Sequence, residues 1–129
     1  MIQSNAFDYI NVLDKAADAA WLRNEAISNN ISNVDTPGYK RQDVNFELQL
    51  QRAIKSNRYE SIDDKVANIK LNRLNPITYR DHSDFSYRLD GNNVDIDTEN
   101  VELASNQIRY QGLTDSISQE FANLQLVMK

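Results

Sequence analysis

Apolar side chains recur at helical spacing at both ends of this chain and not in its middle. Near the N-terminus they alternate in steps of three and four residues, which places one narrow apolar seam along a helix. The residues of this N-terminal seam are Ile10, Leu13, Ala17, Ala20, Asn24, Ile27, Ile31 and Val34. Such a seam is buried only when another helix packs against it, so the pattern predicts a helical partner.

The C-terminal part of the chain carries a second stripe with the same spacing. Its residues are Tyr110, Leu113, Ile117, Phe121, Leu124 and Met128, and Val101, Ala104 and Ile108 continue it upstream at a slipped phase. The candidate partner of the first helix is therefore in the same chain. Pairing within one subunit, as in a small helical bundle, and pairing between subunits both satisfy the two stripes.

The fold class that follows is mainly α, with long N- and C-terminal helices that pair as a coiled coil around a small, irregular, β-containing middle. We expect an N-terminal axial helix over 1–34, a middle segment over 35–93 and a C-terminal axial helix over 94–129. Pro37 and Gly38 end the first helix, because proline donates no hydrogen bond and glycine tolerates a positive φ. We expect Ser4 or Asn5 to cap its start, and the polar Asn24 could fix the register of the pair.

Signals in the middle segment are weaker. A short helix is expected after Asp43 or Asn45, followed by a mobile loop through 63–64. Alternating apolar residues predict strands over 77–79 and 85–89. The turn residues 90–93, leading to Val94 and Ile96, indicate a small hairpin. Asp97 or Thr98 is expected to cap the second long helix, where Glu99 and Glu102 complement the helix dipole.

Composition excludes several classes of function. The 129 residues carry a formal net charge of −5, which argues against nucleic-acid binding because that needs a basic face. The chain has no cysteine, so disulfides and thiolate metal sites are ruled out. No cleavable signal pattern and no run of 18 apolar residues is present. If the protein leaves the cytoplasm, we expect another export route.

Candidate chemistry is sparse. His82 lies between Asp81 and Asp84, but a metal site needs about three or four protein ligands, so we interpret the group as a solvated loop. The acidic run over 90–99 lacks calcium-loop spacing, and a turn followed by a helix cap explains it better. No nucleophile motif or phosphate-binding loop is present, so we expect no catalytic site, no cofactor and no small-molecule substrate. A metal-dependent hydrolase around His82 is kept as a rival hypothesis.

The segment that closes the first helix, Asn30-Ile31-Ser32-Asn33-Val34-Asp35-Thr36-Pro37-Gly38-Tyr39, resembles a signature of bacterial flagellar rod, hook and hook-associated axial proteins. That family usually has Ala where Ser32 stands and Asn where Asp35 stands. The resemblance therefore identifies Asn30, Asn33, Thr36, Pro37, Gly38 and Tyr39 as family-motif residues.

Later stretches look like the proximal-rod members of that family, the B-type subunit in particular, with the C-type subunit as the alternative. These stretches are 40–47, 90–99 and 106–111, which leave 48–89 mostly unmatched. The resemblance implies a structural subunit of the flagellar basal body in the cell envelope. Its copies would pack through both end helices into a helical tube that transmits motor torque.

The implied partners are further copies of the chain, other flagellar rod subunits and the adaptor FliE at the membrane-ring junction. The flagellar type III apparatus would export the chain without a cleaved signal peptide. A cytoplasmic coiled-coil adaptor or export chaperone would share the stripes and is the remaining alternative.

Overall fold

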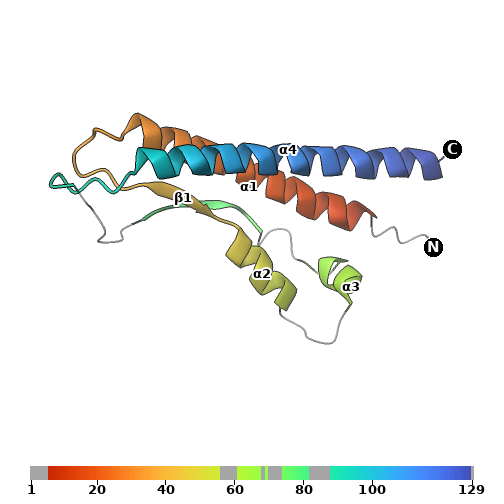
Figure 1. Ribbon diagram of the computed structural model, residues 1–129. Coiled ribbons are helices and arrows are strands. Elements are labelled where there is room, and N and C mark those ends of the chain that lie inside the picture. Colours follow the sequence, from red (N-terminus) through yellow and green to blue (C-terminus); the bar gives the residue numbers. More distant parts are fainter. Residues whose placement is uncertain (1–5, 56–60, 68, 70–73, 82–87, 129) are drawn as a thin grey trace.

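A computed structural model describes residues 6–55, 61–67, 69, 74–81 and 88–128. Two long helices dominate it, α1 (Ala6–Ser32) and α4 (Ile96–Val127), which lie side by side (Figure 1). They run antiparallel, since Asn30 meets Glu99 at one end while Ala20 meets Asn106 further along. The expected fold class, with paired long helices and a small middle, is confirmed.

The first helix stops where the sequence predicts, to within two residues. The α-helix ends at Ser32, and a tighter turn continues it to Val34, whose N–H donates to the Ile31 carbonyl at 3.3 Å. Helix ends commonly tighten in this way. Gly38 then takes a φ of +72°, as expected for a residue without a Cβ. The expected caps Ser4 and Asn5 lie outside the described residues.

The residue that caps the second long helix lies earlier in the chain than expected. Its N-cap is Asp95, in extended conformation, and the Asp95 carboxylate accepts from the N–H of Asp97 at 3.0 Å and from the Thr98 hydroxyl at 3.2 Å. The prediction of Asp97 or Thr98 as the cap was therefore wrong. All three residues are good capping types, and the extended backbone of Asp95 decides among them.

The middle segment contains a two-stranded antiparallel sheet of β1 (Gln42–Asn45) and β2 (Ile77–Arg80), in which Gln42 lies opposite Arg80. The strand predicted at 77–79 is confirmed. The hairpin predicted around 90–93 was wrong, because Ile96 starts α4 and Leu89 is a fully exposed turn residue. Phe85 and Tyr87 lie outside the described residues. β1 was missed since it contains a single apolar residue, Val44.

Two short helices complete the middle segment, α2 (Glu47–Lys55) and α3 (Ile62–Ala67). α2 confirms the short helix expected there. The loop predicted through 63–64 was wrong, because these residues form the first turn of α3. Ser61 caps that turn: its hydroxyl accepts from the Asp64 N–H at 3.2 Å and donates to the Asp64 carboxylate at 2.8 Å.

The apolar core lies where α1 meets the middle segment. Its buried residues are Ala19, Ala26, Val44, Phe46 and Leu74, and Ala16, Leu22, Leu50, Ala53 and Ile69 pack against them. Alanines let the sheet and α2 approach the helix backbone closely. α1 is thus buried on two sides, by α4 and by the middle segment. No helix in the described part of the chain combines the length and apolarity needed to cross a membrane.

Candidate functional site: a polar clamp at the helix junction

The N-terminal seam residues are all at least half-buried within the subunit. Ile10, Ala17, Ala20 and Ile27 are buried, and Leu13, Asn24, Ile31 and Val34 are partly covered. The C-terminal stripe divides. Leu113, Ile117 and Leu124 are partly buried, whereas Ile108 is 74% and Phe121 48% exposed. The structure therefore pairs the helices within one subunit and leaves part of the second stripe uncovered.

Polar and aromatic contacts fix the register of α1 against α4. The side-chain amide of Asn106, which is buried, donates to the carbonyl of Ala20 at 2.7 Å. Next to it Trp21 and Tyr110 face each other with ring centroids 6.1 Å apart. The Oδ1 atoms of Asn24 and Asn106 are buried without a hydrogen-bond partner among the described residues. The register role expected of Asn24 stays a prediction; the contact to α4 is made by Asn106.

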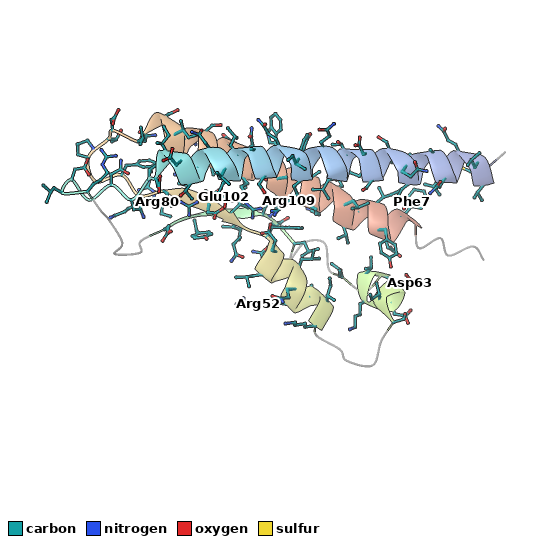
Figure 2. All side chains as sticks on the ribbon, in the orientation of Figure 1. Phe7, Arg52, Asp63, Arg80, Glu102 and Arg109 are labelled. Atoms are coloured by element: carbon teal, nitrogen blue, oxygen red, sulfur yellow. The ribbon has the colours of Figure 1, made fainter. Side chains whose placement is uncertain are left out.

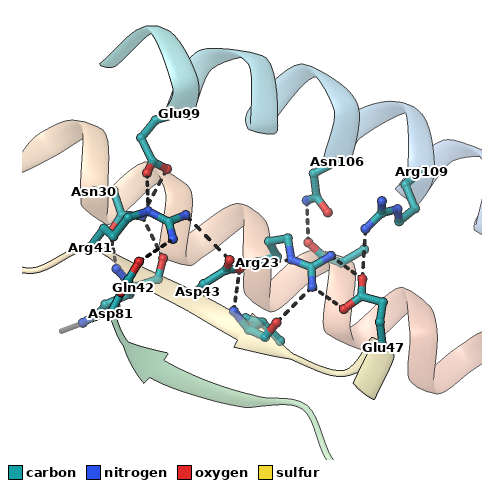
Figure 3. Close-up of polar contacts among 12 residues, drawn as sticks. Arg23, Asn30, Arg41, Gln42, Asp43, Glu47, Asp81, Glu99, Asn106 and Arg109 are labelled. Atoms are coloured by element: carbon teal, nitrogen blue, oxygen red, sulfur yellow. Dashed lines mark hydrogen bonds and ion pairs between the residues drawn. The ribbon is translucent and has the colours of Figure 1, made fainter. Parts of the chain in front are cut away.

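The family-motif residue Asn30 is fully buried and joins three segments of the chain (Figure 3). Its Nδ2 donates to the Gln42 carbonyl at 2.8 Å and to the Glu99 carboxylate at 3.1 Å. Its Oδ1 accepts from the Gln42 N–H at 2.7 Å and from the Tyr39 hydroxyl at 3.2 Å. Burial raises the pKa of the Tyr39 phenol, which keeps this hydroxyl a donor.

Glu99, in the first turn of α4, pairs with Arg41 just before β1. The Arg41 Nε lies 2.8 Å from the Glu99 Oε1, and the carboxylate side chain is 1% exposed. Asp43 and Asp81 flank the same guanidinium at 3.6 and 3.5 Å. A buried carboxylate is tolerated only with such a partner. Glu99 was expected to complement the helix dipole; its described contacts are with Arg41 and Asn30.

Asn92 closes the open end of α1. Its buried Nδ2 lies within 3.0 Å of three carbonyl oxygens, those of Asn33, Val34 and Thr36. Arg88 also donates to the Val34 carbonyl. Helix C-termini leave carbonyls without intrahelical partners, so a side chain from elsewhere in the chain supplies the donors here. We call Asn30, Tyr39, Arg41, Asn92 and Glu99 the helix-junction clamp.

Backbone contacts tighten the same junction. The Gly38 N–H donates to the Asp90 carbonyl at 2.7 Å, and the Lys40 ammonium donates to the Gly91 carbonyl at 2.6 Å. Gly91 has a φ of +77°, and its position lies against Gly38, so the two glycine turns cross closely. Residues 90–93, which lead into α4, thus contact the motif at the end of α1 along its length.

A second polar network lies further along the helices. Arg23 of α1 is 9% exposed and donates twice to the Glu47 carboxylate, at 2.6 Å each. Arg23 also contacts Asp43 at 3.3 Å and the Val44 carbonyl at 2.9 Å, and Arg109 of α4 reaches Glu47 at 3.0 Å. The Arg23 hydrogen bond lowers the pKa of the Glu47 carboxyl. This Arg23–Glu47 network joins α1, α2 and α4 (Figure 3).

Sequence reasoning found part of this site. It identified Asn30, Gly38 and Tyr39 through the motif, but gave no role to Arg23, Arg41 or Asn92. One available signal was Asn92 in a turn-forming run, since asparagine side chains readily bond to backbone groups. Among the described residues no three side chains of metal-binding type gather, and His82 and Asp84 lie outside those residues.

Comparison with known proteins supports the resemblance to flagellar rod proteins over most of the chain. A model of the family "Flagella basal body rod protein" matches residues 10–40, the N-terminal seam and the motif. The chain is 36% identical to the flagellar basal body rod protein FlgB of Bacillus subtilis (strain 168), over 120 residues that cover 92% of each chain.

Two further relatives carry the same name. FlgB of Borrelia hermsii is 36% identical over 135 aligned residues, covering 93% of this chain and 95% of its own. FlgB of Escherichia coli (strain K12) is 29% identical over 118 residues, covering 83% of each chain. This chain belongs to the FlgB family of flagellar basal body rod proteins.

Proposed function

We propose that the chain is a structural subunit of the flagellar proximal rod, whose copies pack into a helical tube that transmits motor torque. One structural observation supports the proposal independently of the family match. α4 has an apolar face that the described part of its own subunit does not cover, with Val101 68% and Ile108 74% exposed. Large apolar side chains in a row on one helix are typical of a protein interface.

The slipped phase of the second stripe has a physical explanation. Tyr110 and Leu113 lie against α1 and are partly buried, whereas Val101 and Ile108 are exposed on another side of the same helix. One helix therefore carries two apolar faces, one for its own subunit and one for a neighbour. Fully burying a valine or isoleucine contributes about 1.5–3 kcal/mol. Repeated around a tube, such contacts would give the wall its stiffness.

The helix-junction clamp supports the same function. A torque-bearing subunit has to keep the angle between its two wall helices fixed under load. The clamp joins the end of α1 to the start of α4 through ion pairs and hydrogen bonds that are largely shielded from water. The clamp would thus act as a rigid corner of each subunit, and its residues are structural rather than catalytic.

The partners follow from this role. We infer contacts with further copies of the chain and with other rod subunits, attachment to the adaptor FliE, and export through the flagellar type III apparatus without a cleaved signal peptide. The cell-envelope part of the flagellum is the corresponding location. The match to FlgB relatives along most of the chain favours this role over a C-type rod subunit or a cytoplasmic adaptor.

Mass spectrometry of detergent-purified hook-basal bodies tests the proposal. The expected result is several copies of this chain per particle. Intact particles that lack the chain, with the protein confined to the cytoplasmic fraction, would contradict the rod assignment and favour the adaptor function.

A further inference from the structure

An open groove lies between α1, α2 and α4, with a volume of about 700 Å³. Its floor is apolar and includes Ala16, Ala19, Phe46, Leu50 and Leu113. An apolar cavity of about 150 Å³ already holds one benzene-sized group, so this groove has room for several aliphatic or aromatic side chains. The space is of a size that a helix from another molecule could enter with one face.

The charged residues at the groove are mostly cationic. Arg23, Lys55 and Arg109 line it together with a single carboxylate, Glu47, which already binds Arg23 and Arg109. Arg52, also on α2, is exposed to solvent and does not line the groove (Figure 2). A helix with an apolar face flanked by acidic residues would therefore complement the groove in both polarity and charge.

The far end of α4 has these properties. Its last turns extend past the first turn of α1 (Figure 1), and they expose Phe121, Leu126, Val127 and Met128 at 48%, 69%, 82% and 82%. Beyond Tyr110 the charged residues of α4 are Asp115 and Glu120, both acidic. The C-terminal end of a helix also carries partial negative charge. We call residues 120–128 the α4 tip.

We propose that the groove of one copy binds the α4 tip of a second copy. The contact is heterologous, since one face meets a different face, and such contacts generate rings or open helical assemblies. For parallel copies the shift along the axis follows from α4 itself. In the contact, Leu126 of one copy would lie at the level of Leu113 of the other copy. These positions are 13 residues apart on α4, so at about 1.5 Å per residue the two copies are displaced by about 20 Å along the helix axis.

The proposal names a specific contact within the proposed rod, and so deepens that function. It also makes a distinction along α4. The exposed face at Val101 and Ile108 lies near the clamp, whereas the tip lies at the other end of the helix, so the two surfaces reach different neighbours. Apolar burial in the groove supplies the attraction, and Lys55 and Arg109 select an acidic helix over a basic one.

Disulfide trapping tests the contact directly, because the natural chain contains no cysteine. Gln51 is exposed and lines the groove, and Leu126 is exposed on the tip. Cells would co-express two chains, one carrying Gln51→Cys and the other Leu126→Cys, and hook-basal bodies would be purified and oxidised. We expect a band at twice the chain mass of 14.8 kDa. The matched control replaces Leu126→Cys by Glu102→Cys, which is exposed near the clamp.

The outcomes separate this contact from the rod assignment. A Gln51–Leu126 dimer several-fold more abundant than the Gln51–Glu102 dimer supports the proposal. If the particles contain the chain but show no excess of the Gln51–Leu126 dimer, the proposed contact is wrong and the rod function is unaffected. If the particles lack the chain, the rod function fails, and the same two pairs oxidised in concentrated purified protein decide the contact.

A charge exchange gives a second, independent readout in the same cross-linking assay. Lys55→Glu is expected to lower the dimer yield by about two- to fivefold, the range of one surface ion pair. Glu120→Lys on the other chain should restore it. An unchanged yield in both variants, with the helical circular dichroism of each intact, contradicts a pairing of Glu120 with Lys55 and hence the charge complementarity on which the contact is argued.

Discussion

Arg41 and Glu99 form an ion pair across the helix junction, with the Arg41 Nε 2.8 Å from the Glu99 Oε1 and the carboxylate 1% exposed. The first residue belongs to the chain leaving α1 and the second to the first turn of α4, so one pair ties two segments far apart in sequence. Asn30 completes the site by donating to the other carboxylate oxygen. A charge this deeply buried needs its partner to remain in place.

Glu99→Gln should therefore destabilise the subunit. The amide keeps the shape of the side chain but removes the charge that Arg41 contacts, and we expect the free energy of unfolding to fall by about 1.5–3 kcal/mol. Urea unfolding followed by circular dichroism measures the change. Glu102→Gln, at an exposed position on the same helix, is the control and should stay within about 0.5 kcal/mol of the unchanged protein. Equal effects of both changes would contradict the role of the pair.

Asn92→Ala should loosen the end of α1. The change removes the amide hydrogen bonds to three carbonyls and the bond that the Asn92 Oδ1 accepts from the buried Val94 N–H, and each such hydrogen bond contributes about 0.5–1.5 kcal/mol. We expect a loss of at least about 2 kcal/mol, together with faster amide exchange over residues 29–36. Asn123→Ala, which removes an exposed contact on α4, is the control. Unchanged exchange in the Asn92 variant would show that the clamp does not hold the helix end.

Two glycines should respond in opposite directions to alanine. Gly38 has a φ of +72° with open space around its missing Cβ, so Gly38→Ala should cost about 1–2 kcal/mol from backbone strain alone. Gly112 lies inside α4 with open space too, and Gly112→Ala should raise the free energy of unfolding by about 0.5–1 kcal/mol. Thermal melting of both variants provides the comparison, and a shift of the same sign in both would be inconsistent with this explanation.

Acid should weaken the Arg23–Glu47 network. The Arg23 hydrogen bond lowers the Glu47 pKa below its ordinary value of 4.5 in the folded state, so the stabilisation is fully present above that value. It is lost as the pH falls through the lower, folded-state pKa. We therefore expect Glu47→Gln to flatten the decline of stability below about pH 5, measured by urea unfolding at several pH values. Glu25→Gln, at an exposed position on α1, is the control.

Two isoleucines distinguish the subunit's own packing from packing between subunits. Ile27 is 2% exposed, so Ile27→Asp buries an unpaired charge, which costs several kcal/mol and should abolish rod incorporation while export continues. Ile108 is 74% exposed, so Ile108→Asp should leave unfolding within about 0.5 kcal/mol yet also prevent incorporation. Swimming assays and basal-body purification give the readout. Wild-type motility in the Ile108 variant would contradict an interface on that face.

Much of the fold was predictable from sequence, because long helices repeat their signal over many turns. The seam from Ile10 to Val34 and the stop at Pro37 and Gly38 are of this kind. β1 was missed because one apolar residue, Val44, shows no alternation. α3 was missed because the polar run that ends at Asp63 and Asp64 was interpreted as a loop, although the Ser61 hydroxyl caps a helical turn there by accepting from the Asp64 N–H.

The candidate site was harder to predict, for a physical reason. Asn30 was identified by resemblance. Its partners Gln42 and Glu99 lie at unrelated separations from it in sequence, so no helical or strand periodicity could point to them. Glu99 had an adequate local explanation at the start of a helix, so nothing in the sequence required Arg41 beside it. Contacts between polar groups depend on tertiary geometry, whereas apolar stripes already appear in the local pattern.

The pairing of β1 with β2 has a consequence for how the middle of the chain can change. Gln42 and Arg80 face each other at the open end of the sheet, and the Asp81 N–H donates to the Arg41 carbonyl at 2.8 Å, so the segment between them starts and finishes at one place beside the clamp. The entropy of closing such a loop grows only with the logarithm of its length, by about 0.6 kcal/mol for each doubling. Residues inserted between α2, which ends at Lys55, and α3, which begins at Ile62, would therefore cost little and leave the angle between α1 and α4 almost unaffected, so the length of this connection can vary while the frame of the subunit stays constant.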